Sequence, residues 1–330
     1  MLQAQWTSDG IHVVDVEPTP LNPGWVRLKV SACGICGSDL HTYRRQSRVV
    51  LAGTPGHEVV GTVMESAEPL PDCLYAVEPW IVCGTCDMCV EGKRHLCRER
   101  GMLGGPQPGG IAEFVDVPSY TLHPVPTEVT PLVASIAEPF AVCVRGIDRA
   151  QLSVDSRALV LGGGTIGLLS GLLARDRTSE VAISVRYPHQ KKTVQDLGLT
   201  AIDEKDVSSW ARDHQPDAII ETIGGTGDSL QTAIEACRPS GRVVVIGVFT
   251  QAPSINALRV VVQELELIGS FIYGEGQSGS ELGDAVSLLP RDQHEISRMQ
   301  THQFPLASIS EAFACAHNKQ SEAIKVTIEP

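Results

Sequence analysis

The chain has 330 residues, which at roughly 150 residues per domain is enough for two domains with buried cores. Its 26 lysines and arginines stand against 39 aspartates and glutamates, and the resulting net charge of −13 argues against nucleic acid and anionic membranes as partners. The first residues lack a basic segment followed by an apolar core, and no apolar run reaches the roughly 20 residues of a membrane helix, so we expect a cytoplasmic protein.

The N-terminal part, up to about residue 140, has the glycine, proline and cysteine content of an irregular β-rich domain. Alternating apolar and polar residues predict strands at 25–30 and 58–63. A further strand at 265–271, a helix near 280–289 and a last strand at 324–328 are expected toward the C-terminus.

From about residue 150, short apolar runs are separated by segments of helix length. Strands are expected at 158–161, 181–185, 217–220 and 242–247, and helices at 165–175 and 228–237. Strands that alternate with helices indicate a parallel, doubly wound sheet.

A glycine-rich turn, Gly-Gly-Gly-Thr-Ile-Gly at 162–167, follows the first of these strands and fits the pattern G-x-G-x-x-G. Glycines there allow a tight turn and the close approach of a pyrophosphate to a helix N-terminus. The expected dinucleotide contacts are Gly162, Gly164, Thr165, Ile166 and Gly167. The alternative is a glycine-rich turn without a ligand.

The segment after 181–185 lacks the acidic residue that would accept hydrogen bonds from the adenosine ribose of NAD. Arg186 stands beside that position, where a guanidinium can pair with a 2′-phosphate. NADP(H) is therefore predicted over NAD(H), with Gln190, Lys191 and Lys192 either assisting or forming only a solvated helix face.

Four cysteines, Cys83, Cys86, Cys89 and Cys97, lie within the segment 83–97. In a reducing compartment this spacing indicates a metal site rather than disulfides. Four sulfur ligands fill every position around tetrahedral zinc, which is typical of a structural ion. The interpretation of the lobe as a zinc finger for nucleic acid is disfavoured by the acidic charge.

A second, dispersed set comprises Cys36, His57, Glu58 and Glu138. Each residue alone is more often structural, as a buried thiol, a hydrogen-bonded imidazole or a surface carboxylate. Together a thiolate, an imidazole and a carboxylate leave one coordination position of zinc open for water or a substrate oxygen.

These motifs together resemble the zinc-dependent medium-chain dehydrogenase/reductases, the alcohol dehydrogenase superfamily, and within it the sorbitol and threonine dehydrogenase-like branch. The resemblance rests on the motifs at 33–41, 56–58, 83–97, 138–139, 162–167, 264–271, 304–306 and 324–326. It implies a GroES-like catalytic domain at 1–142 with a structural zinc lobe at 83–97, an inserted Rossmann domain at 143–275, and a return to the catalytic domain at 276–330. The fold class expected is thus α/β plus β.

The resemblance also implies roles for single residues. Cys36 and His57 would be ligands of a catalytic zinc, with Glu58 and Glu138 ligating directly or through water. Asp39 would orient His57 through the other ring nitrogen, whereas Cys33 matches no ligand of the family. Among the remaining residues, Ser38 would bind the substrate oxygen and His41 would carry the proton onward, unless His41 is only a surface histidine.

The predicted function is hydride transfer between a secondary alcohol or polyol, or the matching carbonyl compound, and NADP(H), with two zinc ions per chain in a homodimer or homotetramer. One alternative is a non-catalytic zinc- and nucleotide-binding scaffold, and another is a threonine dehydrogenase-like enzyme that uses NAD. Metal-free quinone or enoyl reductases share the expected fold but lack such a ligand set. Candidate walls of the substrate pocket are Tyr43, Arg44, Arg45, Trp80 and Phe271, and the two arginines could receive an anionic group or simply face solvent.

Overall fold

The computed structural model describes residues 1–44, 53–277 and 279–330 of the chain. It forms two compact units, a first unit of Met1–Glu138 with Gly274–Pro330 and a second unit of Pro139–Tyr273. None of the helices among the described residues combines the length and the hydrophobicity that a membrane span requires.

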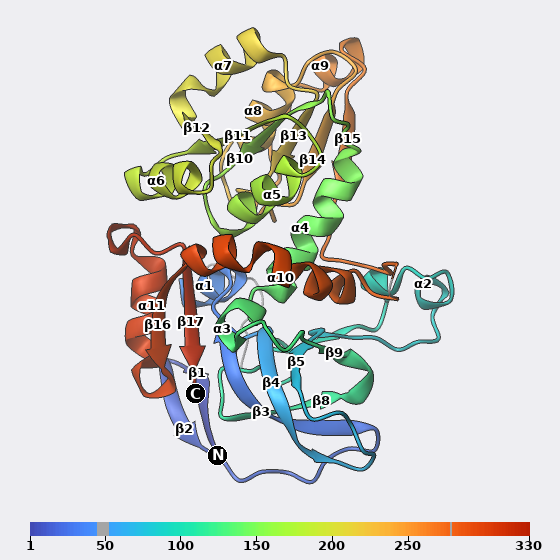
Figure 1. Cartoon of the computed structure of the whole chain (residues 1–330), viewed down its shortest axis with the longest axis vertical. Coiled ribbons are helices and arrows are strands. Elements are labelled where there is room, and N and C mark those ends of the chain that lie inside the picture. Colours follow the sequence, from blue (N-terminus) through green and yellow to red (C-terminus); the bar gives the residue numbers. More distant parts are fainter. Residues whose placement is uncertain (45–52, 278) are drawn as a thin grey trace. The chain divides into compact units, whose positions relative to one another are not determined.

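The first unit is built around a mainly antiparallel sheet with the strand order β16-β17-β3-β4-β5-β9, and β8 pairs with β3 beside this path (Figure 1). Its strands are β3 (Trp25–Gly34), β4 (Glu58–Ser66), β5 (Leu74–Val77), β8 (Phe114–Pro118), β9 (Leu122–Pro124), β16 (Gln300–Pro305) and β17 (Lys325–Glu329). Burial alternates along the first half of β3, where Val26, Leu28 and Val30 are buried and Lys29 is exposed. This alternation is the signature of a strand with one face on a core.

Shorter elements complete the first unit. A hairpin of β1 (Leu2–Thr7) and β2 (Gly10–Asp15) is antiparallel, and β6 (Trp80–Ile81) pairs with β7 (Gly101–Met102). The helices are α1 (Gly37–Tyr43), α2 (Asp87–Val90), α3 (Pro131–Ala134), α10 (Glu281–Met299) and α11 (Ile309–His317). The 3₁₀ turns are η1 (Arg94–Leu96), η2 (Ser119–Thr121), η4 (Leu306–Ser308) and η5 (Lys319–Ser321).

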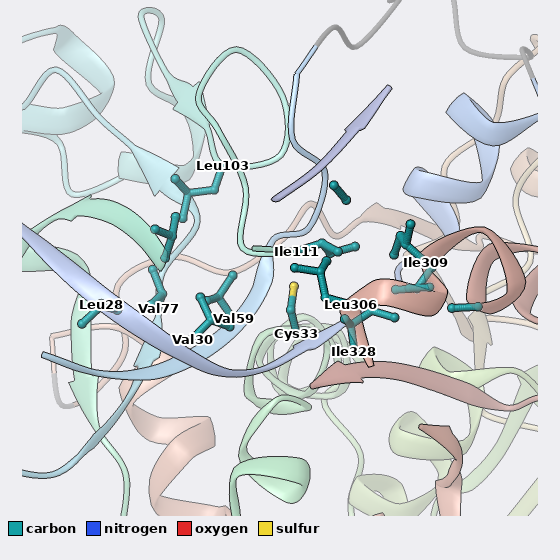
Figure 2. Packing of buried hydrophobic residues seen from close by; sticks show 14 of the residues in the cluster. Leu28, Val30, Cys33, Val59, Val77, Leu103, Ile111, Leu306, Ile309 and Ile328 are labelled. Carbon is teal, nitrogen blue, oxygen red and sulfur yellow. The ribbon is translucent and has the colours of Figure 1, made fainter. Parts of the chain in front are cut away.

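The core of the first unit joins segments far apart in the sequence. Leu28 and Val30 of β3 belong to one buried apolar cluster with Ile328 of β17. Figure 2 shows the Cys33 sulfur in this cluster, near Ile111 and Ile328. Cys33 is fully buried and is therefore a core side chain in the structure.

The second unit contains a parallel sheet with the order β12-β11-β10-β13-β14-β15 (Figure 1). Its strands are β10 (Arg157–Leu161), β11 (Glu180–Val185), β12 (Thr200–Asp203), β13 (Ala218–Glu221), β14 (Arg242–Val245) and β15 (Glu266–Gly269). Its helices are α5 (Thr165–Arg175), α6 (Pro188–Asp196), α7 (Val207–His214), α8 (Ser229–Ala236) and α9 (Ala257–Val262), with a 3₁₀ turn η3 (Glu204–Asp206), and α4 (Ala137–Ala150) begins before the unit boundary. From β10, the chain adds β11 and β12 on one side of the sheet and then β13, β14 and β15 on the other side. This strand order is that of a doubly wound sheet, so the prediction is confirmed.

Candidate functional site

The dispersed ligand set begins at the N-terminus of α1. Cys36 is the N-cap of this helix with an extended backbone, and its N–H donates a 2.9 Å hydrogen bond to Oδ2 of Asp39. Asp39 is only 2% exposed, and its burial raises the pKa of its carboxyl. The same carboxylate faces His57, since its Oδ1 lies 3.9 Å from Nδ1 of the ring. Asp39 thus links the Cys36 backbone to the imidazole.

His57 precedes β4 and is 5% exposed. Its Nε2 lies 3.5 Å from Oγ of Ser38, on α1. Its Nδ1 is buried and has no hydrogen-bond partner within 3.5 Å. Burial opposes protonation of His57, but the adjacent Cys36 and Asp39 outweigh this effect and raise the pKa of the imidazole.

The structure brings Cys36, His57 and Glu58 together, because one ligand atom of each lies within 4.8 Å of the others. Sulfur, nitrogen and oxygen donors in one buried cluster suit zinc, and three protein ligands leave a fourth position for a small molecule. The mixed set of sulfur, nitrogen and oxygen donors therefore fits the expected catalytic metal.

Glu58 begins β4, and its carboxylate forms an ion pair with the Lys325 ammonium of β17. The two side chains are 1% and 2% exposed, and Lys325 Nζ also donates to the Ile35 carbonyl at 3.1 Å. Burial opposes the charge of Lys325, but the adjacent Glu58 outweighs this effect and raises the pKa of the ammonium, so Lys325 is charged. Lys325 has no role predicted from the sequence, where the signal for it is a single lysine among the apolar residues at 324–328.

Glu138 lies at the start of α4 and is 7% exposed. Burial raises the pKa of its carboxyl to about 7, with smaller electrostatic effects from His57, Glu58, Lys325 and Asp39. The charges of the ligand set thus act on Glu138, although the group of three ligand atoms within 4.8 Å does not include it.

The four clustered cysteines also come together. The sulfur of Cys97 lies 3.5 Å from that of Cys83 and 3.9 Å from that of Cys86, and the Cys83 and Cys89 sulfurs are 4.0 Å apart. Tetrahedral zinc with Zn–S bonds of about 2.3 Å requires sulfurs about 3.8 Å apart, so the lobe has the right size. Backbone N–H groups lower the pKa of Cys83 to about 6, which favours the thiolate that a metal needs. All ten cysteines are free thiols.

The glycine turn of the second unit has open space where a nucleotide would lie. Gly162 has φ +110°, and a Cβ at Gly167 would overlap the Gly162 carbonyl oxygen. Gly164 is the N-cap of α5, and a Cβ there would meet nothing within 4 Å. The first and third glycines therefore serve the turn and the packing of the helix, while the second leaves room at the N-terminus of α5. Thr165 and Ile166 form the first turn of that helix.

Arg186 follows β11 and is already engaged in an ion pair. Its Nε lies 2.7 Å from Oε2 of Glu204, and the Arg186 side chain is 61% exposed. Gln190 accepts a hydrogen bond from the Arg186 N–H, and Lys191 pairs with Asp203 at 3.4 Å. Arg186 and Lys191 thus have carboxylate partners near the end of β12, whereas Lys192 pairs with Asp196 on its own helix.

The remaining candidates lie in different places. His41 and Tyr43 are half-buried on α1, Arg44 is the C-cap of that helix, and Trp80 lies on β6 under Arg100. Phe271 belongs to the second unit and is 39% exposed. The candidate Arg45 lies outside the described residues.

Comparison with known proteins identifies the class. Residues 22–127 match the alcohol dehydrogenase GroES-like domain, and residues 165–289 match the zinc-binding dehydrogenase domain. The chain is 28% identical over 327 residues to 2-dehydro-3-deoxy-L-galactonate 5-dehydrogenase of Pseudoalteromonas atlantica, covering 95% of this chain and 94% of that protein. It is 29% identical over 330 residues to sorbitol dehydrogenase of Halalkalibacterium halodurans, covering 95% and 94%. A Sinorhizobium meliloti protein solved with bound NADP superposes with a TM-score of 0.89 at 28% identity, covering 100% of this chain and 99% of that one.

Two domain matches in the expected order, on a β-rich unit and a doubly wound parallel sheet, define a zinc-dependent dehydrogenase. The chain belongs to the zinc-dependent medium-chain dehydrogenase/reductase superfamily, the superfamily of alcohol dehydrogenases. The expected fold class, a GroES-like domain with a Rossmann-like sheet, is confirmed.

Proposed function

We propose that this enzyme transfers hydride between a secondary alcohol or polyol, or the matching ketone or aldehyde, and NADP(H). The observation that carries the proposal is the buried set of Cys36, His57 and Glu58 beside the helix that bears Ser38 and His41. The names of the relatives, a sorbitol dehydrogenase and a sugar-acid dehydrogenase, support a polyhydroxylated substrate.

Two zinc ions per chain are part of the proposal. Cys36 and His57 would hold the catalytic ion, with Glu58 or Glu138 as the carboxylate, directly or through water. The four cysteines of the lobe at 83–97 would hold the structural ion. A zinc ion at the first site supplies a Lewis acid that lowers the pKa of a substrate hydroxyl, and a bound nicotinamide supplies the hydride acceptor.

The residues of α1 would position the substrate and move its proton. The Ser38 hydroxyl, 3.5 Å from His57 Nε2, would accept a hydrogen bond from the substrate hydroxyl, and as the alcohol is oxidised it would take that proton while passing its own on toward His41. His41 is three residues further along the same helix, hence on the same face, and passes the proton outward. Asp39 keeps the His57 ring in place by facing its Nδ1. In the reductive direction the same groups return the proton.

The preference for NADP(H) rests on Arg186. No acidic residue follows β11 at 185–187, and the exposed guanidinium of Arg186 can exchange its carboxylate partner Glu204 for a 2′-phosphate. The solved relative with bound NADP supports this choice. A threonine dehydrogenase-like enzyme that uses NAD is the alternative, with Glu204 as the acidic residue beside the ribose.

We assign the first unit to catalysis and the second to the dinucleotide, and we place the enzyme in the cytoplasm as a homodimer or homotetramer. The open edge of the parallel sheet, β15, supports association between copies. β15 and the helix α9 that precedes it in the chain carry exposed apolar side chains, namely Leu258, Val261, Val262 and Leu267. An unpaired strand with apolar neighbours is a template for pairing with a second copy.

Two serine variants test the proposal together. Cys36→Ser should lose one of two zinc ions and all turnover while it binds NADPH like the wild type. Cys89→Ser, the matched control in the lobe, should lose the other zinc ion and thermal stability. Normal turnover in Cys36→Ser would refute the catalytic metal. Two zinc ions, normal NADPH binding and no turnover of any secondary alcohol or polyol by the wild type would favour the non-catalytic scaffold.

A further inference from the structure

The strand β17 has one apolar and one polar face, although both faces are buried. Val326 and Ile328 belong to the apolar core of the first unit, whereas Lys325 and Thr327 alternate with them and face the other way. These two polar side chains are 2% and 0% exposed. On this face Lys325 pairs with Glu58 of the dispersed ligand set, and Thr327 makes a second polar contact.

That second contact belongs to a buried network around the side-chain amide of Gln300, on β16. The Thr327 hydroxyl donates a 2.7 Å hydrogen bond to Oε1 of Gln300. The amide nitrogen of Gln300 donates at 2.7 Å to the Leu132 carbonyl and at 3.2 Å to Oγ of Ser135. The Ser135 hydroxyl donates to the same carbonyl at 2.8 Å. Because the Leu132 carbonyl can only accept, the network fixes the orientation of the amide and gives each of its side chains a partner.

The network ends on the turn that leads to Glu138. Ser135 is the C-cap of α3, and Glu138 follows three residues later, in the first turn of α4. The two residues between them, Ile136 and Ala137, are 0% and 1% exposed. Such a closely packed link has little freedom to move, so the position of Ser135 determines that of the Glu138 carboxyl. At this position the charge of His57 acts on Glu138.

We propose that Gln300 is a positioning residue for the catalytic zinc site: by joining Thr327 to the turn before α4, it keeps Glu138 with the other members of the dispersed ligand set. This inference rests on the proposed function, because it concerns the metal that acts there. The polar face of β17 then positions both carboxylates of the site. Lys325 holds Glu58 directly, and Thr327 holds Glu138 through Gln300.

A structural explanation competes with this proposal, because buried hydrogen bonds also stabilise a fold. Under that explanation, loss of the Thr327 hydroxyl lowers thermal stability and leaves zinc affinity unchanged. If the network positions Glu138, the same loss weakens zinc binding at the catalytic site, and the effect requires the Glu138 carboxylate. Zinc affinity therefore separates the two explanations, whereas stability does not.

The test measures the zinc bound per chain after dialysis against buffers of fixed free zinc concentration. The wild type should bind zinc in two steps, and the step that Cys36→Ser lacks belongs to the catalytic site. Thr327→Val and Gln300→Met remove hydrogen bonds of the network with side chains of similar size, whereas Thr327→Ser keeps the hydroxyl. The matched control is Thr121→Val, which removes an equally buried hydroxyl that donates at 2.7 Å to the Pro118 carbonyl, outside the network.

We expect Thr327→Val and Gln300→Met to weaken zinc binding at the catalytic site about tenfold, as is typical for residues that support metal ligands. The step of the cysteine lobe should not change. Thr327→Ser should bind zinc like the wild type, and Thr121→Val should lower the thermal midpoint without altering either step. Unchanged zinc affinity in Thr327→Val and Gln300→Met would overturn the inference, as would an equal loss in Thr121→Val.

A double-mutant cycle with Glu138→Gln tests whether the network acts through this carboxylate. In the Glu138→Gln background, Thr327→Val should cause no further loss of zinc affinity, because the group that the network positions is gone. Additive losses would overturn the inference. Turnover by the wild type together with unaltered zinc affinity in the network variants would leave the proposed function standing alone. If the zinc affinities behave as expected and no secondary alcohol or polyol is oxidised, the proposed function fails and the positioning role stands.

Discussion

The buried ion pair between Glu58 and Lys325 gives the sharpest prediction on stability. Lys325→Met keeps the shape of the side chain and removes its charge. In the zinc-free protein, in which unfolding is measured, the Glu58 carboxylate would then lie 1% exposed, beside the carboxyls of Asp39 and Glu138 and without a counterion. Gly34 packs so closely that a Cβ there would overlap Glu58, so the carboxylate has little room to turn toward another partner.

The size of the effect follows from the burial of both groups. Two unit charges about 3 Å apart attract by about 5 kcal/mol at an effective dielectric constant of about 20. Removing one member of such a pair leaves a buried charge and costs about 3–5 kcal/mol. We therefore expect Lys325→Met to lower the free energy of unfolding of the first unit by about 4 kcal/mol. Lys93 offers the matched control, because it pairs with Glu91 at 2.8 Å on the surface, and Lys93→Met should cost less than about 1 kcal/mol.

Tryptophan fluorescence can follow this unit alone. Of the four tryptophans, Trp6, Trp25 and Trp80 lie in the first unit and Trp210 in the second. Urea unfolding in a Trp210→Phe background therefore reports on the first unit. Adding Glu58→Gln to Lys325→Met should recover part of the loss, because it removes the uncompensated charge. A cost for Lys325→Met as small as that for Lys93→Met would refute the reasoning.

Three further predictions concern the second unit. Arg186→Ala should weaken NADPH binding about tenfold and leave NADH binding unchanged, whereas Glu204→Gln should strengthen NADPH binding by freeing the guanidinium. Both affinities are measured by fluorescence titration. Unchanged NADPH affinity in both variants would reject the assignment of Arg186 to the 2′-phosphate. Gly164→Ala should keep the thermal midpoint and lose cofactor affinity, while Gly167→Ala should lower the thermal midpoint. A lower thermal midpoint for Gly164→Ala than for Gly167→Ala would contradict the roles given to these two glycines. Val261→Glu, which places a charge on the exposed apolar face of α9, should yield a smaller species in analytical ultracentrifugation, and an unchanged mass would exclude this surface as the interface.

Much of the parallel sheet could be predicted from sequence because its central strands are buried on both faces. The apolar runs of the sequence predict β10, β11, β13 and β14, and the predicted helix at 165–175 coincides with α5. β12 (Thr200–Asp203) was missed because it is short, contains polar residues and lies at the edge of the sheet. The helix expected near 280–289 continues to Met299 through Pro290, since buried residues on both sides of the proline hold it against the unit.

The parts of the site that lie close together in the sequence could be predicted, whereas the contacts between distant segments could not. The cysteine lobe and the glycine turn are short segments whose spacing carries the chemistry, so the sequence sufficed to bring their members together. Glu58 and Lys325 are 267 residues apart, and the pairing of β3 with both β17 and β4 brings them into contact. The same holds for Arg44 and His317, which are 273 residues apart. Contacts of this kind depend on the fold and leave no local pattern.

X-ray absorption at the zinc edge of the zinc-loaded protein tests the central claim most directly, because it measures the ligands around the metal. A closed site of four sulfurs together with an open site of one sulfur and lighter ligands predicts an average of about 2.5 sulfur ligands per zinc. The Cys36→Ser variant should then show sulfur ligands alone. A wild-type protein with sulfur-only zinc would contradict the catalytic metal site, and with it the proposed activity.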